Sequence, residues 1–234
     1  MTPLKSRIAE NHRRVLRRVE SACRRSGRDP AEVRLVAVTK YAEVDWILCL
    51  VELGVHDLGE NRPQQLLQRA AALPETIRWH LVGHLQRNKV RPILPVTAWI
   101  HSVDSVRLLD RIERLAGELN RRPRVLLEVN VSGEESKYGF SPSELQAEWP
   151  RIVKYQNMEI AGLMTMAPYV ADPEQTRPVF RELRELRDRL RTSVEGAPPL
   201  PELSMGMSND FEVAVEEGAT MVRIGSLLFE GLST

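Results

Sequence analysis

Residues 33–53 read VRLVAVTKYAEVDWILCLVEL and contain the unit that decides the fold. Val33–Thr39 is a short apolar run rich in β-branched residues, which predicts a buried strand. Glu43–Leu53 follows a few residues later with apolar side chains at helical spacing, which predicts a helix that packs on this strand. A buried strand followed directly by an amphipathic helix is the repeating unit of parallel α/β folds.

The same order of strand and helix recurs along the whole chain. Seven further apolar runs predict strands, at Val55–Leu58, Arg78–Val82, Trp99–Val103, Arg124–Asn130, Met158–Met164, Glu202–Met205 and Met221–Ile224. The other clear helical segments are Arg62–Ala72, Ser105–Leu119 and Arg177–Arg191. Eight such units predict a closed (β/α)8 TIM barrel. The alternative is a doubly wound open sheet, but the glycine-rich dinucleotide fingerprint that often opens such a sheet is absent after the first strand.

A helix precedes the first strand. Pro3–Arg25 carries apolar residues at helical spacing, and Gly27 lies just past its end, where glycine commonly ends a helix. The chain has 234 residues, close to the roughly 250 of one typical barrel. We therefore expect a single domain over residues 1–234, with an N-terminal helix within 1–27 and the barrel within 33–229.

Composition and charge exclude several function classes. The 33 Lys and Arg residues nearly cancel the 32 Asp and Glu residues to a net charge of +1, which argues against a nucleic-acid binder. No apolar stretch approaches the roughly 18 residues of a membrane span, and the first residues lack the apolar core of a signal peptide. The two cysteines, Cys23 and Cys49, show no CxxC or framework spacing. We therefore expect a cytoplasmic location with no membrane partner.

Lys40 lies where a barrel carries its chemistry, directly after the first predicted strand. Alternation along the strand places Val36, Val38 and Lys40 on one face. If that face points into the barrel, the ammonium group is unfavourable unless it is paired, neutralised or bonded to a ligand. A lysine in such a site can attack an aldehyde and form a Schiff base. On this residue alone, a lysine that reaches solvent at the strand end is an equally good interpretation.

The last predicted strand, Met221–Ile224, places Arg223 on the face opposite its two apolar neighbours. Those neighbours suit the outer face that helices cover, which turns Arg223 inward, where a guanidinium needs an acceptor. Gly225 and Ser226 follow at once, in a loop that barrels commonly use to bind phosphate. Because glycine lets backbone N–H groups approach an anion closely, this loop predicts a phosphate site. A turn glycine beside a structurally paired arginine is the alternative.

Two further strand ends carry candidate ligands. Ser208 is a good helix N-cap, and Asp210 and Glu212 complement the first turn that would follow it. A helix N-terminus also binds anions, although these carboxylates oppose a phosphate unless they face away from it. The neighbouring Gly225 loop favours the phosphate interpretation. Asn61, after the second strand, is a predicted helix cap that could also reach a ligand at the barrel mouth.

A metal site is not expected. His80 and His84 have the i, i+4 spacing of some metal ligands, but Gly83 and the strand-to-loop setting break the helix that such a pair needs. No carboxylate lies near the pair in sequence. The chain also lacks a nucleophile elbow, a phosphate-loop motif and a paired-carboxylate arrangement.

Six short motifs occur in a fixed order along the chain. They are Val36–Lys40 (VAVTK), Gly59–Asn61 (GEN), His80–Lys89 (HLVGHLQRNK), Gly162–Met166 (GLMTM), Ser204–Ser208 (SMGMS) and Val222–Ser226 (VRIGS). Together they resemble the pyridoxal phosphate homeostasis protein family, which is similar to the barrel domain of alanine racemase. The resemblance runs from about Leu35 to Phe229. Each motif alone is weak evidence, but six in this order are highly specific.

The resemblance implies a cofactor and its site. Lys40 would hold pyridoxal 5'-phosphate (PLP), a form of vitamin B6, as a Schiff base, and Arg223 would face the pyridine nitrogen. The other residues implied in the site are Ser208, Gly225 and Ser226 at the phosphate, with Asn61 and Met166 lining the pocket. The family members are monomers that bind PLP, keep the free aldehyde low and supply it to PLP-dependent apo-enzymes, without established turnover. Members often continue after the lysine with a further lysine and a proline, whereas this chain has Tyr41 and Ala42.

Two enzyme interpretations stand beside a PLP carrier. A racemase-like amino-acid enzyme would use Lys40 as its base, and an aldolase would attach a sugar phosphate to Lys40 directly. An arginine at the ring nitrogen disfavours ring protonation and so weakens the electron sink that PLP enzymes use. Alanine racemase also takes a tyrosine from a second domain and a partner subunit, and we expect no such domain in a chain that ends at Thr234. These points favour a carrier without catalytic turnover.

Overall fold

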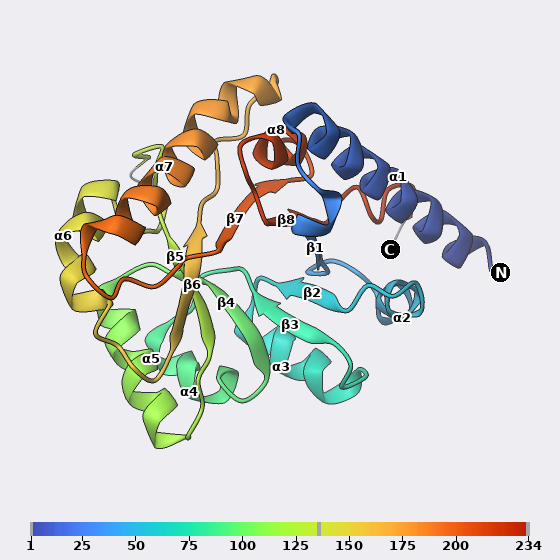
Figure 1. Ribbon diagram of the computed structural model, residues 1–234. Coiled ribbons are helices and arrows are strands. Elements are labelled where there is room, and N and C mark those ends of the chain that lie inside the picture. Colours follow the sequence, from blue (N-terminus) through green and yellow to red (C-terminus); the bar gives the residue numbers. More distant parts are fainter. Residues whose placement is uncertain (1, 135–136, 233–234) are drawn as a thin grey trace.

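Eight parallel strands close into a barrel in the order β1 to β8 in the computed structural model, which describes residues 2–134 and 137–232 (Figure 1). The strands are Arg34–Val38 (β1), Asp57–Glu60 (β2), Arg78–Leu81 (β3), Thr97–Val103 (β4), Arg124–Glu128 (β5), Glu159–Met164 (β6), Glu202–Met207 (β7) and Met221–Ile224 (β8). The barrel closes where β8 pairs with β1, with Val36 beside Arg223. The predicted TIM barrel is confirmed, and the open sheet is excluded.

Helices follow the strands and surround the barrel (Figure 1). They are Pro3–Ser26 (α1), Val44–Glu52 (α2), Pro63–Ala72 (α3), Val90–Ile93 (α4), Val106–Glu118 (α5), Pro142–Ile152 (α6), Arg177–Ser193 (α7) and Phe211–Glu216 (α8), with short 3-10 turns at Pro30–Glu32, Arg87–Lys89 and Pro173–Thr176. No boundary of a predicted strand or helix differs from the observed one by more than two residues. The periodicity of apolar residues was therefore sufficient to locate these elements.

Apolar residues form one cluster inside the barrel and a larger one between the strands and the helices. The inner cluster consists of Val36, Trp99, Leu126, Ala161, Met164 and Met221. In β8, Val222 and Ile224 belong to the outer cluster, whereas Met221 belongs to the inner one. Side chains alternate along a strand, so Arg223 points into the barrel, as predicted.

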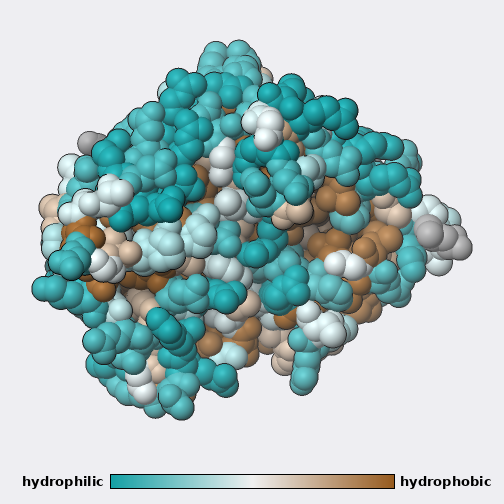
Figure 2. Space-filling model, in the orientation of Figure 1, coloured by the Kyte–Doolittle hydropathy of each residue, from teal (hydrophilic) through white to brown (hydrophobic). Residues whose placement is uncertain are grey.

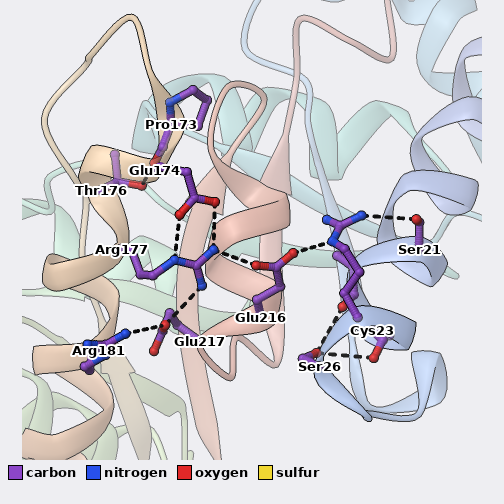
Figure 3. A network of polar contacts seen from close by, with 12 residues as sticks. Ser21, Cys23, Ser26, Pro173, Glu174, Thr176, Arg177, Arg181, Glu216 and Glu217 are labelled. Atoms are coloured by element: carbon purple, nitrogen blue, oxygen red, sulfur yellow. Dashed lines mark hydrogen bonds and ion pairs between the residues drawn. The ribbon is translucent and has the colours of Figure 1, made fainter.

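Helix α1 lies outside the barrel beside α2 and α8 (Figure 1). A network of ion pairs joins it to α7 and α8 (Figure 3). Glu216 accepts hydrogen bonds from Arg25 of α1 and Arg177 of α7, each at 2.6 Å. Arg177 also bonds Glu174 at 2.7 Å and Glu217 at 3.1 Å. Because its members share charges, such a network stabilises the helix contacts more than isolated surface pairs would.

The face of the molecule in Figure 2 is largely hydrophilic, and apolar residues show mainly in hollows between the helices. Helix α7 illustrates the reason, because its four buried residues are Phe180, Leu183, Leu186 and Leu190. These residues pack in the outer cluster, so the apolar face of α7 is buried and its charged face is left to solvent. Within residues 2–134 and 137–232, no helix is long and apolar enough to cross a membrane.

Candidate functional site

The carboxyl ends of four neighbouring strands bring the predicted site residues together. Strands β7, β8, β1 and β2 lie side by side in the closed barrel. Lys40 follows β1, Asn61 follows β2, Ser208 follows β7, and Gly225 and Ser226 follow β8. Parallel strands end on the same side of a barrel, so these residues share one mouth.

Lys40 lies at the rim of this mouth. The residue is half-buried, two positions past the end of β1. Its Nζ atom lies 5.0 Å from the centroid of the Tyr41 ring, and Tyr41 is 78% exposed. The amine thus lies beside an exposed side chain, and the backbone of Lys40 lies in the loop that follows β1.

Helix α3 holds the backbone on both sides of Lys40. Arg69 donates from Nη1 to the carbonyl oxygen of Thr39 and from Nη2 to that of Ala42, both at 2.6 Å. Gln65 donates to the carbonyl oxygen of Lys40 itself at 3.1 Å. Helix α3 therefore holds the loop that carries the amine at three carbonyl groups, those of Thr39, Lys40 and Ala42.

Glu60 supports this arrangement from the end of β2. It is fully buried, and one carboxylate oxygen accepts from the Thr39 hydroxyl and pairs with Arg69. Burial raises the pKa of Glu60, and the hydrogen bonds from Thr39 and Arg69 oppose that rise. Sequence reasoning did not assign a role to Glu60, Gln65 or Arg69, although Glu60 lies inside the GEN motif.

Arg223 lies deep below the mouth. The residue is 5% exposed. Its Nη1 atom donates to the backbone oxygen of Ser204 at 2.8 Å and to the Ser204 hydroxyl at 2.7 Å. Its Nη2 atom donates to the carbonyl oxygen of Thr165 at 2.9 Å. Burial lowers the pKa of Arg223 to about 10, although Asp210 and Glu128 attract its charge. The group is therefore still a cation at neutral pH, at the floor of the site.

The loops after β7 and β8 meet at the end of β1, two residues before Lys40. The backbone N–H of Gly225 donates to the Ser208 hydroxyl at 3.4 Å. A Cβ atom on Gly225 would lie 3.1 Å from the carbonyl oxygen of Val38, so the glycine allows this loop to lie against the end of β1. Ser226 is exposed at the same place. This side of the mouth combines a backbone N–H group with two hydroxyls, and groups of this kind can bind an anion.

The predicted N-cap role of Ser208 is wrong. Helix α8 begins at Phe211, and Asp210 occupies the cap position, where its carboxylate accepts from the Met207 N–H at 2.6 Å. This closes the turn and leaves the Ser208 hydroxyl to bond Gly225. Glu212 pairs with Arg18 of α1 at 2.6 Å, so its carboxylate points towards α1.

The predicted cap role of Asn61 is also wrong. Arg62 is the N-cap of α3 and makes no side-chain cap hydrogen bond, and Pro63 begins the helix and favours an extended conformation at the residue before it. Asn61 remains half-buried at the mouth. Its backbone packs tightly on the next loop, since a Cβ atom on Gly83 would lie 2.2 Å from the Asn61 carbonyl oxygen.

His80 and His84 point to different surroundings. His80 is buried in the barrel and bonds Asp57 at 3.0 Å, whereas His84 stacks on Tyr138 at 4.1 Å and pairs with Asp104 at 3.0 Å. In the part of the chain that the structure describes, no group of three or more His, Cys, Asp or Glu residues could hold a metal ion.

Glu128 adds a titratable group that sequence reasoning missed. It ends β5, two positions after the inner-cluster residue Leu126, and is 4% exposed. Burial, together with the nearby charge of Asp104, raises the pKa of Glu128 to about 7. Alternation along β5 was the available signal, because it places Glu128 on the inner face. Met166, predicted to line the pocket, packs against the inner cluster.

Comparison with known proteins shows the family of this chain. A family model described as alanine racemase, N-terminal domain, matches residues 7–233. The pyridoxal phosphate homeostasis protein of Aquifex aeolicus is 45% identical over 217 residues, which cover 92% of this chain and 94% of that protein. The chain belongs to the pyridoxal phosphate homeostasis protein family.

Two further proteins are similar to this chain in sequence or structure. The human protein is 40% identical over 230 residues, covering 93% of this chain and 84% of the human protein. PipY of Synechococcus elongatus PCC7942, solved with PLP bound, is 38% identical and superposes with a TM-score of 0.80, covering 92% of this chain and 99% of that chain. The resemblance seen in the sequence motifs is therefore confirmed over nearly the whole chain.

Proposed function

We propose that this protein binds PLP at the barrel mouth and holds it as a Schiff base on Lys40. The observation that carries the proposal is the position of three groups on adjacent strands. They are the Lys40 amine after β1, the hydroxyl and N–H groups of the loops after β7 and β8, and the buried cation Arg223 on β8. These groups match the aldehyde, the phosphate and the ring of PLP. PipY, a relative of 38% identity, has been solved with PLP bound.

Each residue has a distinct task in this proposal. The amine of Lys40 would attack the aldehyde carbon, and one water molecule would leave as the carbon–nitrogen double bond forms. Ser208, Gly225 and Ser226 hold the phosphate through hydroxyl and N–H groups. Arg223 faces the ring nitrogen, Asn61 and Met166 line the pocket, and the α3 contacts keep the Lys40 loop in place.

We further propose that the bound PLP is a store and not a catalyst. The guanidinium of Arg223 is positively charged at neutral pH and disfavours protonation of the ring nitrogen, which weakens PLP as an electron sink. A Schiff base can exchange with other amines, so a single-domain, monomeric, cytoplasmic carrier could limit free aldehyde and pass PLP to PLP-dependent apo-enzymes. This role in PLP homeostasis agrees with the name of the family.

An absorption experiment tests the proposal. The purified wild type and Lys40→Ala are titrated with PLP, reduced with borohydride and weighed by mass spectrometry, with Lys154→Ala, an exposed lysine after α6, as the matched control. We expect a yellow band and a mass gain after reduction in the wild type and the control, and neither in Lys40→Ala. A wild type that stays colourless and gains no mass would overturn the proposal. Turnover of amino acids by the yellow protein would instead identify an enzyme.

A further inference from the structure

A continuous chain of polar side chains crosses the barrel interior behind Arg223. The Asp57 carboxylate bonds His80 Nε2 at 3.0 Å, and His80 Nδ1 bonds His101 Nε2 at 2.9 Å. His101 Nδ1 then bonds the Ser204 hydroxyl at 2.9 Å, and this hydroxyl accepts from Arg223 at 2.7 Å. The chain connects β2, β3, β4, β7 and β8, from the first residue of β2 to the floor of the mouth.

Every member of the chain is buried. His80, His101 and Ser204 are 0% exposed, Arg223 is 5% exposed and Asp57 is 8% exposed. Buried polar groups are unfavourable unless each is hydrogen-bonded, and an apolar barrel interior of similar volume would avoid that requirement. The presence of this chain of hydrogen-bonded side chains in the barrel therefore needs an explanation other than filling the core.

The two ends of the chain are charged and its middle is neutral. Asp57 accepts two bonds from Arg78, at 2.9 and 2.5 Å. Although burial opposes ionisation, the hydrogen bonds from Arg78 and His80 hold the pKa of Asp57 well below its usual range. Burial lowers the pKa of His80 and of His101, so both imidazoles are neutral at pH 7.

These charges give every hydrogen bond one direction. A carboxylate only accepts, so His80 donates from Nε2 and its Nδ1 must accept. His101 therefore donates from Nε2 to His80, and its own Nδ1 accepts the Ser204 proton. The Ser204 oxygen is then left to accept from Arg223. The ionised Asp57 carboxylate thus fixes the donor and the acceptor of each hydrogen bond across the barrel, and with them the orientation of the Ser204 hydroxyl.

The chain does not deliver protons to the mouth. It ends on a guanidinium that stays protonated at neutral pH, so Arg223 cannot accept a proton passed along it. What the chain controls is the position of that guanidinium. Two of its contacts, the Ser204 hydroxyl and backbone oxygen, hold Nη1, and the Thr165 carbonyl holds Nη2. A guanidinium has five N–H donors, so three of them are committed to the protein.

We propose that Ser204, His101, His80 and Asp57 are positioning residues that orient Arg223 in the mouth of the barrel. The orientation of Arg223 by these four residues does not require a bound ligand. Its effect on PLP rests on the proposed function, in which Arg223 faces the ring nitrogen. Loosening Arg223 should weaken PLP binding without removing the amine of Lys40.

The first test uses the ligand-free protein. Long-range 15N–1H NMR spectra of the imidazoles, recorded at pH 7, should show His80 and His101 neutral and protonated at Nε2. Asp57→Asn should change the nitrogen shifts of both rings, because an amide presents a donor where the carboxylate only accepts. Glu202→Gln is the matched control, since Glu202 also begins a strand, pairs with an arginine and has a similarly buried side chain (16% against 11% exposed). Nδ1-protonated or charged rings in the wild type would overturn the inference.

The second test measures PLP binding. Ser204→Ala removes one acceptor of Arg223, and we expect about fivefold to tenfold weaker binding, as for other coupled buried contacts. Borohydride should still attach PLP to Lys40, and the absorption band should shift with the altered surroundings of the ring. Ser102→Ala removes a buried hydroxyl that bonds the Gly83 carbonyl at 2.7 Å and should leave the band unchanged.

The outcomes separate the two proposals. Wild-type affinity and an unshifted band in Ser204→Ala would refute the positioning role. A wild type that binds no PLP, with the expected imidazole protonation, would refute the proposed function and leave the orientation of Arg223 standing. Equal losses in Ser204→Ala and Ser102→Ala would mean that general loosening of the barrel, and not the chain, weakens binding.

Discussion

Arg69 donates from Nη1 to the carbonyl oxygen of Thr39 at 2.6 Å, and so a helix fixes the residue that directly precedes Lys40. The same guanidinium pairs with Glu60, whose side chain is fully buried. A carboxylate in that position depends on its partner, because removal of one member of a buried pair leaves an uncompensated charge. The amine and the buried ion pair are therefore mechanically linked.

Arg69→Gln should lower the free energy of unfolding by about 3 kcal/mol and weaken PLP binding about tenfold. Denaturant unfolding and PLP titration measure the two effects. Gln68→Ala, at an exposed position of the same helix, should change neither. The double variant Glu60→Gln/Arg69→Gln should recover part of the lost stability, because the buried charge is then absent. Additive losses in the double variant would contradict the pairing.

Gly83→Ala should displace Asn61, because the new Cβ atom would lie 2.2 Å from the Asn61 carbonyl oxygen. We expect a loss of about 1 to 3 kcal/mol in unfolding free energy, as for other overpacked sites, and weaker PLP binding. Gly117→Ala is the control. Its Cβ atom would approach only the flexible Asn157 side chain, at 3.2 Å, and alanine favours the surrounding helix. Similar losses in both variants would show that the close approach at Gly83 is unimportant.

Ser226→Asp should weaken PLP binding about a hundredfold or more, since like charges in close contact oppose each other by several kcal/mol. Ser226 is exposed, so the variant should fold normally. Pyridoxal, which lacks the phosphate, is the informative comparison. Its affinity should change little in Ser226→Asp, and Ser226→Ala should have a small effect on either ligand. An equal loss for PLP and pyridoxal would remove this loop from the phosphate site.

Glu128 should make stability fall with rising pH. Burial and Asp104 raise its pKa from the ordinary 4.5 to about 7, so the folded state binds this proton more tightly than the unfolded state. The contribution is complete below pH 4.5 and is lost as pH rises through 7. Glu128→Gln cannot ionise and should not lose this contribution. Between pH 5 and pH 8, its free energy of unfolding should therefore rise by about 2 to 3 kcal/mol relative to that of the wild type.

Denaturant unfolding of both proteins at pH 5 and pH 8 checks this sign. Glu195→Gln, at an exposed position, should leave the pH dependence of the wild type unchanged. If the stability difference between the wild type and Glu128→Gln stayed nearly constant from pH 5 to pH 8, Glu128 would be ionised in the folded protein throughout that range, and its pKa would not be raised.

Alternation and periodicity explain which features were predictable. The inward direction of Arg223 followed from its apolar neighbours in β8, and the barrel followed from eight repeated units. The caps at Asn61 and Ser208 were wrong because a proline and an aspartate nearby decided the helix starts. Where several possible N-cap residues lie within three positions, the local sequence does not show which of them caps the helix.

Side-chain contacts between different strands and helices could not be predicted. His80 and His101 lie on different strands, and their ring contact depends on the register of β3 against β4, which carries an irregularity at Trp79/His80. The clamp of Arg69 on Thr39 likewise joins a helix to a loop 30 residues earlier. A usable signal existed for His101, because it follows the inner-cluster residue Trp99 by two positions and alternation therefore places it on the inner face.

The pairing of β8 with β1 also bears on how the protein folds. Val36 and Arg223 are direct neighbours in the closed barrel, yet they belong to the first and last strands. Joining segments so far apart in sequence is entropically unfavourable and tends to come late in folding. Lys40 and Gly225 lie on opposite sides of that seam. The proposed site is therefore incomplete in a chain emerging from the ribosome until β8 joins β1, and a ligand bound there would stabilise only the completed barrel.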